Sequence, residues 1–69
     1  PVILFVGRLL WNKGIKELVE AAKLMKPHLK FRLVIVGAPD ERNPEAVPGT
    51  YLEELHRNGV IDWVGRQTD

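Results

Sequence analysis

The segment from Val2 to Gly14, VILFVGRLLWNKG, constrains the fold most strongly. Residues 2–6 are a continuous apolar run that ends at Gly7, and Gly14 precedes a stretch with apolar residues at helical spacing. A run that is apolar on both faces is typical of a parallel strand covered on both sides. The segment therefore predicts a buried strand, a turn at its carboxyl end and a helix amino terminus, which is where open α/β sheets bind ligands.

Two cations, Arg8 and Lys13, lie between these two glycines. A helix amino terminus attracts anions. An arginine fork and a lysine point charge beside it suit the oxygens of a phosphate or diphosphate. We therefore predict that Arg8 and Lys13 bind such a group; the alternative is that they are ordinary solvated charges flanking a turn.

The rest of the chain alternates between strand and helix patterns. Helical spacing from Ile15 to Met25 is stopped by Pro27, and Thr50 and Glu53 form a capping-box pattern before a helix that Asn58 and Gly59 would close. The expected strands cover 2–6, 31–36 and 60–64, with a long loop over 37–49. The order predicts an α/β fold, a Rossmann-like β-α-β-α-β fragment with a parallel sheet.

In such a fragment both helices would cover the same face of the sheet and leave the other face bare. The first strand is purely apolar, the second carries Arg32, and the third alternates through Asp62. This gradient favours a central place for the first strand, and an edge place for the third, in the sheet of a longer protein. Residues 1–69 are thus expected to be part of one domain, and the piece alone is expected to self-associate through its apolar face.

Composition and motif spacing exclude several classes of function. The net charge of +1 gives no basic face for nucleic acid, and no apolar run approaches the roughly 18 residues of a membrane span. No signal peptide is expected, since the chain opens directly on a strand pattern. The first turn is neither a dinucleotide fingerprint nor a Walker A loop, and the second strand ends at Gly37, not at an acid that would bind a ribose. No metal-type histidine cluster is present, and the chain has no cysteine.

Three runs carry a family resemblance: VGRLLWNKGIKELVEAAKLM, FRLVIVG and VIDWVGRQTD. Together they resemble the carboxyl-terminal domain of glycosyltransferase family 4, whose members are retaining enzymes of GT-B architecture. The resemblance covers essentially the whole chain and is nearest to bacterial enzymes that build capsule, exopolysaccharide and the O-antigen of lipopolysaccharide. It implies that residues 1–69 are half of a Rossmann-like, donor-binding carboxyl-terminal domain.

The resemblance also implies roles for particular residues. Diphosphate binding falls to Gly7, Arg8 and Lys13, and the nucleotide cleft would be lined by Gly37, Ala38, Arg66 and Gln67. The Glu-x7-Glu motif of the family would lie beyond Asp69, so no catalytic residue is expected in this chain and the chain alone is expected to be inactive. The loop over 38–49 is either flexible surface or a family-specific element of the cleft.

The activity that the resemblance implies is transfer of a sugar from a nucleotide-diphosphate donor, with a UDP-sugar expected, to a saccharide or lipid-linked acceptor. Neither a cofactor nor a metal ion is expected to take part. Such an enzyme would act in the cytoplasm, with peripheral association at the inner membrane through parts outside this chain. The alternatives are a non-catalytic nucleotide- or phosphate-binding α/β module and a purely structural half of an α/β protein.

Overall fold

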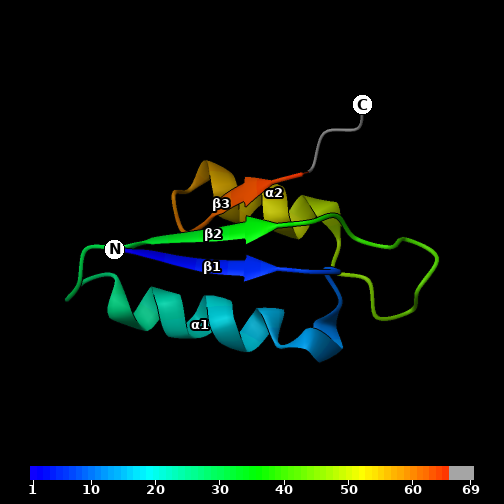
Figure 1. Cartoon of the computed structure of the whole chain (residues 1–69), viewed down its shortest axis with the longest axis horizontal. Helices are drawn as coiled ribbons and strands as arrows, with labels where there is room; N and C mark the ends of the chain where they lie inside the picture. Colours follow the sequence, from blue (N-terminus) through cyan, green and yellow to red (C-terminus); the bar gives the residue numbers. More distant parts are fainter. Residues whose placement is uncertain (66–69) are drawn as a thin grey trace.

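The computed structural model describes residues 1–65 and has a three-stranded parallel sheet in the order β1-β2-β3. The elements in chain order are β1 (Val2–Val6), the 3-10 helix η1 (Trp11–Lys13), α1 (Ile15–Met25), β2 (Arg32–Val36), α2 (Gly49–Arg57) and β3 (Asp62–Val64) (Figure 1). The predicted α/β class, the alternation of strands and helices and the parallel direction are confirmed.

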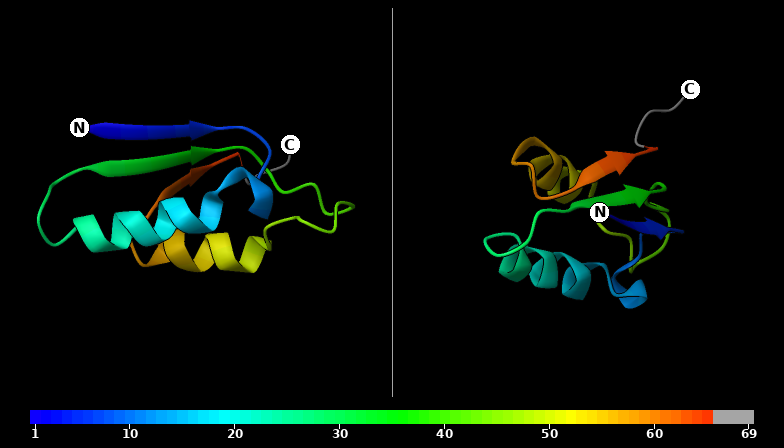
Figure 2. Two further views of the ribbon diagram at one scale, coloured as in Figure 1. Left: turned by 90° about the horizontal axis from the view of Figure 1, so that it is seen from below. Right: turned by 60° about the vertical axis from the view of Figure 1, so that its left-hand side comes forward.

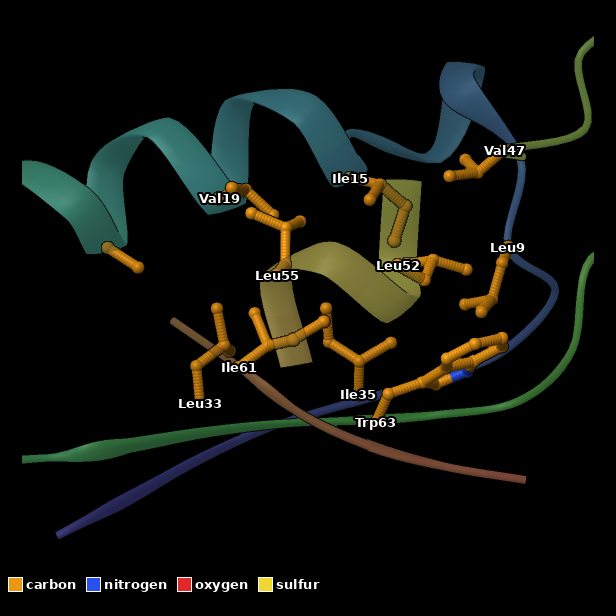
Figure 3. Close-up of a cluster of buried hydrophobic side chains, with 11 residues drawn as sticks. Leu9, Ile15, Val19, Leu33, Ile35, Val47, Leu52, Leu55, Ile61 and Trp63 are labelled. Carbon is orange, nitrogen blue, oxygen red and sulfur yellow. The ribbon is translucent and has the colours of Figure 1, made fainter. Parts of the chain in front are cut away.

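Both helices pack on one face of the sheet, as the left view of Figure 2 shows. Between them and the sheet lies a core of buried apolar side chains from α1, α2, β2, β3 and the loops between the elements (Figure 3). On the sheet side the core is formed by residues of β2, β3 and the turn before β3. On the opposite side it is formed by side chains of α1 and α2. Its members include Ile15, Val19, Leu33, Ile35, Leu52, Leu55, Ile61 and Trp63.

Helix α1 begins and ends where the sequence predicts. Gly14 adopts a left-handed conformation with φ +87° immediately before it, a backbone geometry that glycine reaches without steric cost. The helix ends at Met25, two residues before Pro27, because proline lacks the N–H that a further helical turn would need. The first turn of α1 therefore follows the carboxyl end of β1 after only the short segment that contains η1.

The capping box predicted at Thr50 and Glu53 is wrong. Helix α2 begins at Gly49 with Pro48 as its N-cap, and no side chain caps it. Pro48 has an extended backbone, and its carbonyl accepts hydrogen bonds from the amides of Tyr51 and Leu52 at 3.1 and 3.3 Å. Thr50 therefore lies inside the first turn and not before it.

Two strands are shorter than predicted. Phe31 stays outside β2, and its carbonyl accepts a hydrogen bond from Lys26 Nζ at 3.2 Å. The amide of Val60 bonds to the carbonyl of Leu55 at 3.0 Å, which closes α2 after Asn58 and Gly59 as predicted and delays β3 to Asp62.

The face of the sheet away from the helices is bare. On β1 the side chains of Val2, Leu4 and Val6 are 59, 60 and 66% exposed. β2 is central among the three strands and β1 is an edge, so a central place for β1 in a longer sheet stays a prediction. In residues 1–65 no helix has the length and apolar character needed to cross a bilayer.

Candidate functional site

Three glycines form the surface at the carboxyl end of the sheet, which we call the glycine floor. The register pairs Val6 with Val36 and Val36 with Val64, so that the next residues, Gly7, Gly37 and Gly65, lie side by side. A Cβ on Gly37 would collide with the carbonyl oxygen of Gly7, and a Cβ on Gly65 would lie 3.1 Å from the amide nitrogen of Gly37. At Gly37 and Gly65 a side chain would meet neighbouring backbone, whereas a Cβ on Gly7 would lie 3.9 Å from the ring of Phe5. Glycine at a strand end is typical of places where another backbone or a ligand approaches closely.

This floor continues the hydrogen-bond ladder of the sheet. The amide of Gly7 donates to the carbonyl of Val36 at 3.1 Å, and the amide of Gly37 donates to that of Val64 at 3.0 Å. The indole Nε1 of buried Trp63 donates to the carbonyl of Gly37 at 2.9 Å. The glycine floor is therefore held in place by backbone bonds and by one core side chain.

Arg8 follows the floor directly and reaches into the loop between β2 and α2. Its Nη2 lies 3.1 Å from Oδ2 of Asp40; the Arg8 side chain is 65% exposed and that of Asp40 is 27% exposed. Asp40 also contacts Arg42, whose Nε lies 3.6 Å from Oδ1 and whose amide donates to the same oxygen at 3.2 Å. A guanidinium with one donor engaged and most of its surface in water can still bind an anion.

Lys13 ends the short helix η1 and is exposed. Its ammonium makes no ion pair within the described residues 1–65. Segment 7–14, which carries both Arg8 and Lys13, leaves the carboxyl end of β1 and leads into α1 (Figure 1). The two cations thus lie on one short segment at the end of the sheet where ligands of α/β folds bind.

The loop over 38–48 is fastened to that same segment. The amide of Trp11 donates to the carbonyl of Glu45 at 2.7 Å, and that of Val47 donates to the carbonyl of Leu9 at 3.0 Å. Leu10 and Ala46 form an antiparallel bridge. These bonds join residues 45–47 to residues 9–11, and both alternatives for the loop stay predictions.

A cavity of about 420 Å³ lies beside α1, and neither of these cations is in its lining. It is lined by Trp11, Lys16, Glu17, Glu20 and Tyr51. The rings of Trp11 and Tyr51 meet edge to face with their centroids 5.1 Å apart. Arg8 and Lys13 lie outside this cavity, so the candidate site is the exposed carboxyl edge of the sheet.

The family described as "Glycosyl transferases group 1" matches residues 1–69. The chain belongs to the group 1 glycosyl transferases. One curated relative is the Campylobacter jejuni N,N'-diacetylbacillosaminyl-diphospho-undecaprenol alpha-1,3-N-acetylgalactosaminyltransferase, 35% identical over 69 residues. The match covers all of this chain and 16% of the relative. The predicted glycosyltransferase is thereby confirmed as a member of group 1, and its assignment to family 4 stays a prediction.

The structure describes some of the predicted site residues of this group 1 glycosyl transferase chain and not others. Gly7 and Gly37 form the floor, exposed Ala38 follows it, and the carbonyl of Ala38 accepts a 3.5 Å hydrogen bond from the amide of Leu9. Arg66 and Gln67 lie outside the described residues. Ligand contacts of all these residues stay predictions. Residues 1–65 contain no group of three or more His, Cys, Asp or Glu side chains that could hold a metal ion.

Three residues that the structure places in or near the site are not singled out by the sequence: Gly65, Asp40 and His56. Gly65 could have been found from the repeated Val-Gly that ends each strand, whereas nothing in the sequence pairs Asp40 with Arg8. His56 carries no signal in the sequence for a role in packing, but it is half-buried and its Nδ1 accepts a 3.1 Å hydrogen bond from the amide of Trp63. That bond ties the end of α2 to β3.

Proposed function

We propose that this chain is the donor-side part of a retaining family 4 glycosyltransferase. The enzyme would transfer a sugar from a nucleotide diphosphate, with UDP as the expected carrier, to a lipid-linked saccharide. The name of the Campylobacter relative, an N-acetylgalactosaminyltransferase acting on a diphospho-undecaprenol saccharide, supports this acceptor class. A cytoplasmic enzyme at the inner face of the membrane, working on surface polysaccharide, fits the same proposal.

One observation carries the proposal: Arg8 and Lys13 follow a side-chain-free glycine floor at the carboxyl end of a parallel sheet in a group 1 glycosyl transferase. A diphosphate is a dianion or trianion that needs close backbone approach and fixed positive charge. The floor offers the first, and the two side chains offer the second.

The chemical step explains why cations are needed here. Breaking the bond between the anomeric carbon and the diphosphate oxygen leaves negative charge on the departing nucleotide. Cations already in position stabilise that charge in the transition state without reorganisation. Arg8 would bind two phosphoryl oxygens through its fork and Lys13 would add a point charge, while the acceptor and the remaining donor contacts come from outside residues 1–69.

The test is turnover of the full-length enzyme with Arg8→Ala and with Lys13→Ala. Each substitution is expected to slow transfer by about a hundredfold or more, the usual loss when one preorganised donor is removed. Lys23→Ala is the matched control, because Lys23 lies in the last turn of α1 and pairs with Glu20 at 3.6 Å. Near wild-type rates in both site variants would overturn the proposal.

We further propose that transfer needs no metal ion, since Arg8 and Lys13 would neutralise the leaving diphosphate. Full activity of the intact enzyme in excess EDTA is the expected result. An activity that EDTA abolishes and Mg²⁺ or Mn²⁺ restores would contradict metal independence. Calorimetric titration with UDP and GDP identifies the nucleotide; binding without any transfer would favour the non-catalytic module instead.

A further inference from the structure

Asp40 is the side chain that the structure places on Arg8. Its Oδ2 lies 3.1 Å from Nη2 of Arg8, and the Asp40 side chain is more shielded than the arginine that it contacts, 27% against 65% exposed. No sequence pattern links the two residues, which are 32 positions apart.

The position of Asp40 is fixed by its own turn. Its carbonyl accepts the amide of Asn43 at 2.9 Å, and its Oδ1 accepts the amide of Arg42 at 3.2 Å. The loop that carries this turn is fastened to residues 9–11 by the backbone bonds described above. The carboxylate is therefore held at a set place relative to the end of β1, from which Arg8 emerges.

The contact uses only a small part of the guanidinium. An arginine has five N–H donors, and the structure commits one nitrogen, Nη2, to Asp40. A long exposed side chain loses rotamer freedom when it binds a ligand, and a residue that already restrains it reduces that loss. A carboxylate on one corner of the fork would orient the other donors without occupying them.

We propose that Asp40 is a positioning residue that holds the Arg8 guanidinium ready for the linked phosphates of the nucleotide. This inference rests on the proposed function, in which Arg8 binds the diphosphate. It assigns to the loop over 38–48 a role in the site: it carries the carboxylate that orients the arginine.

If Asp40 instead competed with the nucleotide for Arg8, its removal would have the opposite effect on nucleotide binding. A carboxylate beside an anion site lowers the local positive potential, and it can compete with phosphate for Arg8. If competition dominated, removal of Asp40 would tighten nucleotide binding. If positioning dominates, its removal weakens binding even though a negative charge has been taken away from an anion site.

The experiment measures the Kd of UDP for the full-length protein by calorimetry, with GDP as the probe if the wild-type protein binds GDP instead. Asp40→Ala is expected to raise Kd about three- to tenfold, the effect of leaving one long side chain unrestrained. Asp40→Asn should raise it less, because the amide oxygen still accepts a bond from Arg8. Glu41→Gln removes the same charge from the neighbouring exposed position and should leave Kd unchanged or slightly lower.

The double variant Arg8→Ala/Asp40→Ala isolates the mechanism. Since Asp40 acts through Arg8, the loss of Asp40 should no longer raise Kd once Arg8 is alanine, and Kd should stay unchanged or fall slightly because a negative charge has been removed. Tighter binding by Asp40→Ala, or an equal weakening with and without Arg8, would overturn the positioning role. An Arg8→Ala variant that binds UDP like the wild type, or a wild-type protein that binds neither nucleotide, would instead refute the proposed function itself.

Discussion

Tyr51 packs against the core, and its hydroxyl group lies in an unfavourable place for a polar atom. Its hydroxyl is buried and has no hydrogen-bond partner within the described part of the chain, while its ring packs edge to face on Trp11. Burial raises the pKa of this hydroxyl above its ordinary value of 10.0, and the nearby negative charge of Glu20 raises it further. A buried hydroxyl without a partner destabilises the folded state, because it has lost its bonds to water.

Tyr51→Phe should therefore stabilise the protein by about 1 kcal/mol at neutral pH. The unfolded tyrosine ionises near pH 10, whereas the folded one holds its proton to higher pH, so the folded state of the wild type is progressively disfavoured as the pH rises above 10. The variant should lack this part of the alkaline loss. Denaturant unfolding followed by tryptophan fluorescence at about pH 7 and about pH 10.5 compares the two proteins. A variant less stable at neutral pH would contradict this account of the hydroxyl.

At the scale of secondary structure, the closest approach between strand ends is at Gly37. Its φ of +141° and the carbonyl of Gly7 both exclude a side chain there. Gly59 has a φ of +78°, but a Cβ on it would meet nothing within 4 Å. Alanine substitutions at these two glycines therefore separate the cost of an unfavourable backbone conformation from the cost of disturbing close packing.

Gly37→Ala is expected to destabilise the protein by about 3 kcal/mol or more, since the strand ends must move apart in addition to bearing the conformational strain. Gly59→Ala should cost only the strain, about 1–2 kcal/mol. Thermal unfolding of both variants in the intact protein measures the difference. Equal losses would mean that contact between the ends of β1 and β2 is not tightly packed.

The helices and strands were predictable because their signals are local. The apolar run over 2–6 and the helical spacing after Gly14 need no knowledge of distant residues. The capping-box pattern Thr50-x-x-Glu53 gives the wrong helix start because Pro48, whose backbone is rigid, begins the helix earlier. The contact of Arg8 with Asp40 joins two loops, and nothing in sequence spacing determines how loops meet.

At the scale of the whole molecule, the two faces of the sheet differ sharply. Phe5 packs against the core on the helix side, so by strand alternation Leu4 and Val6 point to the opposite side, where they pair in register with Val34 and Val36. The only ion pair across this face in residues 1–65 is Arg32 with Asp62, at 2.8 Å. The apolar face defined by Val2, Leu4, Val6, Val34, Val36 and Val64 is larger than scattered surface residues would give, and such faces associate in water.

A protein made of these 69 residues alone should therefore form dimers or larger species, as the sequence predicts. Leu4→Lys places a charge in the middle of the apolar face and should shift the population toward monomer, because burying an unpaired ammonium in an interface is strongly unfavourable. Leu24→Lys is the matched control: Leu24 is 76% exposed on α1, on the helical side of the sheet, so the same change there should leave association unaltered. Analytical ultracentrifugation over a range of concentrations measures both. If the wild-type chain stays monomeric, or if the two lysine variants dissociate it equally, the bare face of the sheet is not the surface through which the chain associates.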